Sequence, residues 1–190
     1  LVLNFNMKDL KYIYFLTRVD GLGTVRIKRL IDKFITAENV FNAGLSELTE
    51  VENISDKTAL SILGSVKSHN EYEEQFDELL SRAEKLNVTI LSLTDDNYPD
   101  LLKRIYDPPV ILYIRGNYDK NSLVNSIGIV GTRKPSDYGK KMSEKFAVEL
   151  STAGISVISG FARGVDTFAH RAVLSNNSAI GITAAVFGCG

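Results

Sequence analysis

Residues that build disulfides and metal sites are scarce in this chain. Its 190 residues include one cysteine, two histidines and no tryptophan. The lone cysteine, Cys189, excludes an internal disulfide, and so few Cys and His residues do not predict a metal site. No run approaches the roughly 18 consecutive apolar residues of a membrane-spanning helix, and the start lacks the charged-then-apolar pattern of a signal peptide. We therefore expect a cytoplasmic protein with no metal and no membrane association.

The chain carries almost no net charge, but its two parts carry net charges of opposite sign. The net charge is −1, yet residues 1–119 carry 14 Lys and Arg against 19 Asp and Glu, and residues 120–190 carry 8 against 4. A polyanion would therefore meet the C-terminal part of the chain. The sequence begins at Leu1 and stops at "FGCG", directly after a predicted strand. We expect it to be a fragment of a longer protein.

Helical periodicity dominates residues 1–68. Apolar residues recur at helical spacing in "KDLKYIYFLTRV" and "VDGLGTVRIKRLIDKF", and the Gly-Leu-Gly turn resembles a helix–hairpin–helix motif. Residues 51–63 repeat the apolar pattern of residues 19–31 without the glycines, which predicts a compact helical domain of two such units. The glycines would let backbone amides approach a DNA phosphate. Because the second copy lacks them and the region is acidic, a small helical packing module is the alternative.

Residues 69–87 are predicted to form an amphipathic helix with an acidic outer face. The pattern then changes to two strand-like runs, 88–93 and 110–116, with a short helix between them. Pro108 and Pro109 stop that helix and lead into the second run.

The C-terminal part alternates strands, glycine-containing loops and helices. Strand-like runs at 126–130, 155–159 and 182–188 are joined by helical segments at 140–154 and 166–175. This order predicts an α/β fold with a Rossmann-like parallel sheet covered on both faces. The first helix shows one apolar stripe, made of Met142, Phe146, Ala147, Leu150 and Ala153. The predicted domains are a small helical domain (1–68), a connecting helix (69–87) and an extended Rossmann-like domain (88–190).

Two loops are predicted to form the ligand site of this sheet. The loops at 131–139 and 159–166 leave the carboxyl ends of neighbouring parallel strands, so they should face each other. Each contains glycines, backbone N–H groups at a helix start and an arginine, Arg133 or Arg163. That combination suits phosphate. The dinucleotide fingerprint GxGxxG is absent, so we expect no NAD and no other cofactor.

Catalysis is the weaker interpretation of the second loop. Asp166 opens a helix, where it either caps the helix or fixes the loop. His170 lies one turn later, on the flank of that helix. An Asp–His pair suits acid–base work, but no nucleophile accompanies it, because Ser159 lacks the G-x-S-x-G spacing. The flanking Phe161 and Phe168 either stack on a base or belong to the core.

At this point the residues resemble a known family. "IVGTRKPSDYG", "ISVISGFARGVDTFAH" and "GITAAVFGCG", with the upstream "DDNYPDLLKRIYDPPVILYIRGN", are similar in order and spacing to the DNA-processing protein A family (DprA, also called Smf). The resemblance is strong over residues 88–190 and weak over the helical residues that precede them. It implies a single-stranded DNA-binding protein of natural transformation, which protects incoming DNA and helps to load the RecA recombinase. It also implies an extended Rossmann domain preceded by a SAM-like domain, and a homodimer.

The resemblance assigns roles to residues of both loops. It implies DNA or phosphate binding by Gly131, Thr132, Arg133, Lys134, Ser159, Gly160, Phe161, Arg163 and Gly164. Asp166 and His170 would support the loop, and no residue would be catalytic. Ile182 and Ala184 depart from the polar and the larger apolar residue usual at these two positions of the family.

Two other functions compete with DNA binding. One is a Rossmann-type enzyme or carrier for a nucleotide-derived small ligand, although such sites usually include a catalytic glutamate and neither loop contains one. The other is an interaction scaffold in which the helical front binds a partner.

Overall fold

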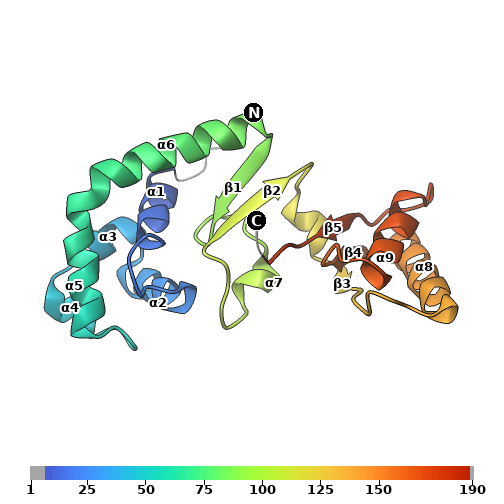
Figure 1. Ribbon diagram of the computed structural model, residues 1–190, viewed down its shortest axis with the longest axis horizontal. Helices are drawn as coiled ribbons and strands as arrows, with labels where there is room; N and C mark the ends of the chain where they lie inside the picture. Colours follow the sequence, from blue (N-terminus) through green and yellow to red (C-terminus); the bar gives the residue numbers. More distant parts are fainter. Residues whose placement is uncertain (1–6, 189–190) are drawn as a thin grey trace. The chain divides into compact units, whose positions relative to one another are not determined.

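The computed structural model describes residues 7–188, and its contacts divide the chain into two units, Leu1–Tyr118 and Asp119–Gly190. Figure 1 traces their elements in chain order. The first unit contains α1 (Met7–Leu16), α2 (Thr24–Phe34), α3 (Ala37–Asn42), α4 (Leu45–Thr49), α5 (Asp56–Ser65), η1 (Val66–Ser68), α6 (His69–Lys85), β1 (Val88–Ser92), α7 (Asp100–Lys103) and β2 (Ile111–Arg115). The second contains η2 (Lys120–Leu123), β3 (Ser126–Gly128), α8 (Asp137–Thr152), β4 (Ser156–Ser159), α9 (Val165–Leu174) and β5 (Thr183–Ala185). No helix within residues 7–188 is long and apolar enough to cross a membrane.

The two sequence-related turns of the helical part have the same backbone conformation. Gly21 in the first turn has φ +74°, and Asn53 at the matching place in the second has φ +67°. Two positions on, Gly23 and Ser55 are the N-caps of α2 and α5, with φ −80° and −83°. Asn is the residue that tolerates left-handed backbone best after Gly. The second copy therefore keeps the hairpin although both glycines have been replaced.

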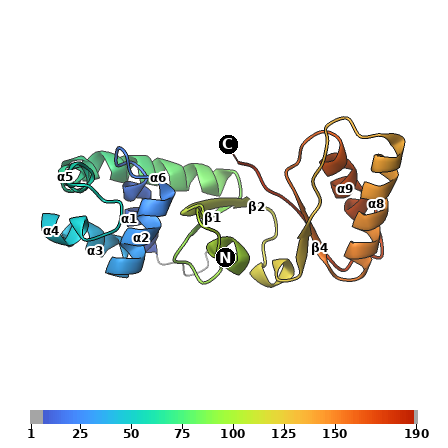
Figure 2. The ribbon, with the colours of Figure 1, turned by 90° about the horizontal axis from the view of Figure 1, so that it is seen from below.

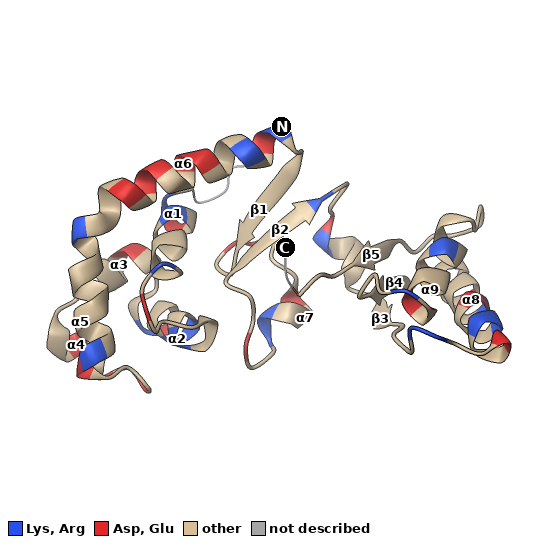
Figure 3. Cartoon of the chain, in the orientation of Figure 1, with Lys and Arg blue, Asp and Glu red and all other residues tan. Residues whose placement is uncertain are grey.

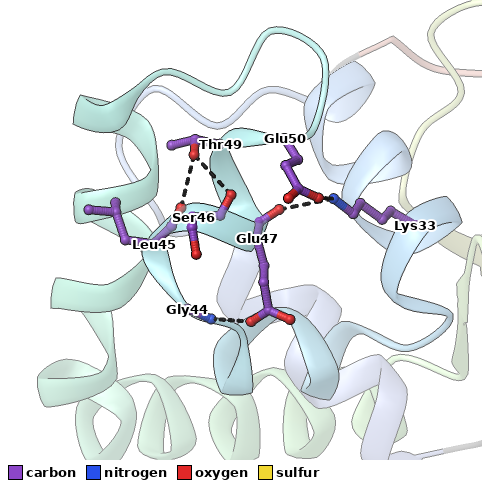
Figure 4. A network of polar contacts seen from close by, with 7 residues as sticks. All are labelled: Lys33, Gly44, Leu45, Ser46, Glu47, Thr49 and Glu50. Atoms are coloured by element: carbon purple, nitrogen blue, oxygen red, sulfur yellow. Dashed lines mark hydrogen bonds and ion pairs between the residues drawn. The ribbon is translucent and has the colours of Figure 1, made fainter.

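A polar network fastens α4 to α2 (Figure 4). The Glu47 carboxylate accepts the backbone N–H of Gly44 at 2.8 Å, which satisfies a free donor at the start of α4. Lys33 of α2 pairs with the Glu50 carboxylate at 2.7 Å and also donates to the Glu47 carbonyl at 3.1 Å. These exposed contacts contribute little energy individually, but they fix the position of a helix too short to be stable alone.

The antiparallel pair β1–β2 shares the hydrophobic core of the helices. Its register runs from Val88 opposite Arg115 to Ser92 opposite Ile111, and the buried Ile90 lies in one cluster with residues of α1 to α6. Tyr98 is 1% exposed and donates its hydroxyl to the Pro109 carbonyl at 2.7 Å; burial raises its pKa to about 12. Because β1 and β2 share this core with the helices, they belong to the first unit, which ends at Tyr118.

The second unit is an α/β sheet with the strand order β3-β4-β5, parallel throughout. The predicted fold class, a helical part followed by an α/β part with a parallel sheet, is confirmed. The prediction that helices cover both sheet faces is wrong within the described part of the second unit, residues 119–188. Val157 of β4 is buried in one cluster with Ala147 of α8 and Ala169 of α9, and Figure 2 shows both helices on one side of β4. Two successive right-handed crossovers in the same direction place both helices on the same side.

The inward face of α8 differs from the predicted apolar stripe. The buried residues are Ser143, Ala147 and Ser151, one turn apart, whereas Phe146 is 54% exposed. Small side chains at this spacing let α8 pack closely against α9. The predicted stripe was wrong at Phe146 and Ala153, which are both exposed. It missed Ser143 and Ser151 because counting apolar residues favours large side chains over small polar ones.

Candidate nucleic-acid interface

Two loops form the candidate site at the carboxyl ends of β3 and β4. We call residues 131–136 the GTR loop and residues 160–164 the FAR loop. The Val165 N–H, directly after the FAR loop, donates to the Thr132 carbonyl at 3.2 Å. A Cβ atom on Gly131 would lie 2.7 Å from the Val165 side chain, so the fit between the loops requires glycine there. The sequence prediction that the two loops face each other is met.

Asp166 joins the two loops through backbone hydrogen bonds. It is 4% exposed, and its carboxylate accepts the N–H groups of Gly131 at 3.3 Å, Gly160 at 3.1 Å and Ala162 at 3.3 Å. The N-cap of α9 is Gly164, with φ +90°. Asp166 is therefore not the N-cap of α9. Its hydrogen bonds match the other interpretation, in which it fixes the loop.

Three cations surround the cleft between the loops. Arg133, Lys134, Ala162 and Arg163 line a cleft of about 500 Å³. The two arginines and the lysine are exposed, and within residues 7–188 none of them forms an ion pair with a carboxylate. Figure 3 shows the basic segment between β3 and α8. Unpaired guanidinium groups beside a fixed loop suit phosphate oxygens.

Ser159 and His170 are held inside the fold. Ser159 is 2% exposed and donates its hydroxyl to the Ile129 carbonyl at 2.6 Å. His170 is 5% exposed and lies on the buried face of α9, not on its flank as predicted. Its Nδ1 lies 2.7 Å from the Thr183 hydroxyl oxygen, and its Nε2 is buried with no hydrogen-bond partner. Burial lowers the pKa of His170, although the nearby Asp166 acts in the opposite direction.

The Thr183 hydroxyl links His170 to β4. Thr183 Oγ1 lies 2.7 Å from His170 Nδ1 and 3.0 Å from the Val157 carbonyl oxygen. Both contacts hold the ring inside the fold. A neutral imidazole that lacks a nucleophile partner gives no support to acid–base chemistry here.

Two supporting residues were missed by the sequence analysis. Ser143 of α8 is 6% exposed and donates to the Val165 carbonyl at 2.9 Å, and Thr167 donates to the Ala162 carbonyl at 2.7 Å. Thr167 thus anchors the FAR loop at Ala162, and Ser143 anchors Val165, the residue directly after that loop. Among residues 7–188, no three His, Cys, Asp or Glu side chains gather closely enough to hold a metal ion. Phe168 is half-buried, whereas Phe161 is 62% exposed with φ +59°.

Comparisons with known proteins agree with this architecture. The model of the DNA recombination-mediator protein A family matches residues 89–190, and that of the SAM-like helix-hairpin-helix tandem matches residues 13–67. Protein Smf of Synechocystis is 34% identical over 177 residues, which are 92% of this chain and 42% of that protein. DNA processing protein DprA of Streptococcus pneumoniae is 41% identical over 99 residues, 52% of this chain and 33% of that protein.

The likeness extends to a solved structure. The X-ray structure of DNA processing protein A (DprA) from Streptococcus pneumoniae superposes with a TM-score of 0.66 at 31% identity, covering 95% of this chain and 58% of that one. The chain spans less than half the length of the curated relatives named above. The family model covers more than half of the chain and includes both loops of the site. The resemblance inferred from the sequence is thus confirmed: the chain belongs to the DNA recombination-mediator protein A family, that of the DprA and Smf proteins.

Proposed function

We propose that this chain binds single-stranded DNA through its phosphates. The observation that carries the proposal is the cleft in which Arg133, Lys134 and Arg163 are exposed and have no carboxylate partner among residues 7–188. Asp166 holds the loops that present them. Membership of a family of DNA recombination-mediator proteins supports DNA as the polyanion.

The proposed contacts come from both loops. Arg133, Lys134 and Arg163 supply charge. The proposed backbone contacts come from loop residues and from Ser159 at the end of β4; the loop residues are Gly131, Thr132, Gly160, Phe161 and Gly164. The buried Asp166 and His170 support the loops from inside the fold. We keep 1–68, 69–87 and 88–190 as the proposed domains, and a binding protein without catalytic activity as the proposed class.

The wider role is also a proposal. As a family member, the whole protein would act in the cytoplasm on incoming DNA during natural transformation, protect the strand, and help to load the RecA recombinase as a homodimer. This chain would supply the DNA-holding part of that activity.

A salt titration with matched variants tests DNA binding. The affinity of the chain for a labelled oligo-dT, measured by fluorescence anisotropy, should fall steeply as salt rises. Arg133→Ala and Arg163→Ala should each weaken binding and reduce the slope of log K against log salt by about 0.7. Arg171→Ala, which removes an exposed cation of the same unit outside the cleft, is the control. Equal slopes for all variants would contradict the proposal.

The competing small-ligand function gives a different result. A nucleoside monophosphate would then displace the oligo-dT at low concentration, or would be turned over when assayed by chromatography. Neither is expected, because one phosphate engages fewer of the cleft's cations than a strand does.

A further inference from the structure

Two phenylalanine rings lie exposed beside the cationic cleft. Phe161 of the FAR loop is 62% exposed and Phe187, which follows β5, is 65% exposed. Their ring centroids are 5.5 Å apart and the planes meet at 65°, an edge-to-face contact. Phenylalanine is usually buried, and this pair is open to a ligand within the described residues.

The fold holds both rings in place. The amides on either side of Phe161, those of Gly160 and Ala162, donate to the buried Asp166. The Val186 N–H donates to the Ser159 carbonyl at 2.9 Å, which ties the segment before Phe187 to the end of β4. The pair is therefore preorganised, and a ligand that covers it need not order it first.

The backbone of Phe161 is held in an uncommon conformation. Its φ of +59° is left-handed, which is rare for a bulky residue. The buried His170 packs beneath Phe161, with ring centroids 5.6 Å apart. Such backbone persists where surrounding contacts impose it and often marks a functional site. Here it leaves an aromatic ring in solvent.

The aromatic pair is continuous with the phosphate cleft. Ala162 and Arg163, which follow Phe161 directly, line the cleft together with Arg133. A strand whose phosphates lie on the arginines would bring its bases next to the rings. Membership of a family of DNA recombination-mediator proteins favours a nucleic-acid strand as the occupant.

We propose that Phe161 and Phe187 form a base-stacking subsite for a nucleobase of the bound strand. This inference rests on the proposed function and adds the reason for its selectivity. Bases within a duplex are stacked on one another and cannot cover the rings, whereas every unpaired base offers a flat face. The subsite therefore favours single strands with little preference for sequence.

An abasic strand separates stacking from phosphate contact. Anisotropy is measured with oligo-dT and with an abasic strand of equal length, using the 190-residue chain. Phe161→Leu and Phe187→Leu keep the apolar volume and should each weaken oligo-dT binding by on the order of tenfold, while binding of the abasic strand stays unchanged. Phe146→Leu, at a 54% exposed phenylalanine of α8, is the matched control. Equal effects on both strands, or none on either, would overturn the subsite.

A tryptophan reporter gives a direct readout. The chain contains no tryptophan, so Phe187→Trp introduces a single tryptophan at the subsite, which can be excited selectively over the eight tyrosines. Oligo-dT should quench it and the abasic strand should not. Quenching by neither strand, while both bind, would overturn the proposal.

The remaining outcomes distinguish this inference from the proposed function. If Arg133→Ala weakens both strands and the phenylalanine variants weaken neither, phosphate binding stands and the subsite fails. If Phe187→Leu converts a dimer to a monomer in sedimentation velocity without changing oligo-dT affinity, the pair is an interface between copies and the proposal is overturned. Far-UV circular dichroism of each variant verifies that it is folded.

Discussion

Gly164 lies against the backbone of Thr132 so closely that a Cβ atom on Gly164 would be 2.3 Å from the Thr132 carbonyl oxygen. Real Cβ atoms do not approach backbone that closely, so the two loops interlock only if position 164 has no side chain. Gly164 also has φ +90°, a conformation that residues with a side chain rarely adopt. A Cβ atom on Gly131 of the GTR loop would likewise come too close, to the Val165 side chain at 2.7 Å. The glycines of the motif are thus required for packing, whatever else they contact.

Gly164→Ala should destabilise the second unit by at least about 1–3 kcal/mol, the usual cost of a residue held in a sparse backbone region. The clash with Thr132 adds to this cost. Urea unfolding followed by circular dichroism measures the effect, and oligo-dT affinity should fall with it. Gly128→Ala is the control, because a Cβ atom there would have no neighbour within 4 Å. Equal stability of the two variants would contradict the interlock.

Asp166→Asn distinguishes two effects of Asp166 on DNA affinity: its hydrogen bonds to the loops and the repulsion of phosphates by its negative charge. Asparagine has one acceptor oxygen and would turn its NH2 group toward an N–H donor, which leaves a buried group unsatisfied at a cost of about 1–3 kcal/mol. If Asp166 holds the loops, DNA affinity should fall although a negative charge near the phosphates has been removed. Asp137→Asn removes an equivalent, exposed charge at the start of α8 and should raise affinity slightly or leave it unchanged. An increase in affinity for Asp166→Asn would contradict the role of Asp166.

The positions of helices, strands and loops were predicted from the sequence better than which face of each helix is buried. The alternation of strands and helices after residue 126 followed from local pattern, and the juxtaposition of the two loops followed from the geometry of parallel strands. The inward face of α8 did not follow, because Ser143 and Ser151 are buried by close helix contact and not by their own apolarity. Nor did the position of His170, whose burial depends on Thr183 of the next strand.

Residues 88–118 show a second limit. Their strand-like runs were predicted, but periodicity does not tell which partner covers a strand. The buried Ile90, Leu93 and Tyr98 join the core of the helices, which includes residues more than 70 positions earlier in the chain. Phe187 was missed for a related reason: the sequence placed it at the end of a strand, and only the structure brings its ring to Phe161.

The repeated hairpins predict opposite effects for two neighbouring glycines. Gly23 has the same N-cap backbone as Ser55, whose hydroxyl accepts the Thr58 N–H at 3.3 Å, and a Cβ atom on Gly23 would meet nothing within 4 Å. Gly23→Ser should therefore stabilise the first unit by about 0.5–1 kcal/mol. Gly21→Ala should destabilise it by about 1 kcal/mol, because Gly21 has φ +74°. Urea unfolding of the three proteins provides the comparison.

Variants of these two glycines also decide between the two interpretations of the helical residues 1–68, DNA contact and packing module. If the Gly-Leu-Gly turn contacts a DNA phosphate through its backbone, Gly23→Ser should weaken oligo-dT binding while it stabilises the fold. If the front is a packing module, affinity should be unchanged. Asn53→Gly provides the control at the hairpin that already lacks glycine.

Acid should destabilise both units, through the half-buried His69 in the first and the buried His170 in the second. Burial lowers the pKa of His69, with Glu73 opposing and Lys11 adding to the effect, and burial likewise lowers the pKa of His170. In the unfolded chain both titrate near 6.5, so below that pH the unfolded state binds more protons and the free energy of unfolding decreases, by at most about 1.4 kcal/mol per pH unit for each histidine. Because the chain has only two histidines, an NMR titration of their ring protons, assigned with His170→Gln, measures both values. A midpoint at or above 6.5 for His170 would contradict its burial as a neutral ring, and His170→Gln should also reduce the loss of stability of the second unit between pH 7.5 and 5.5.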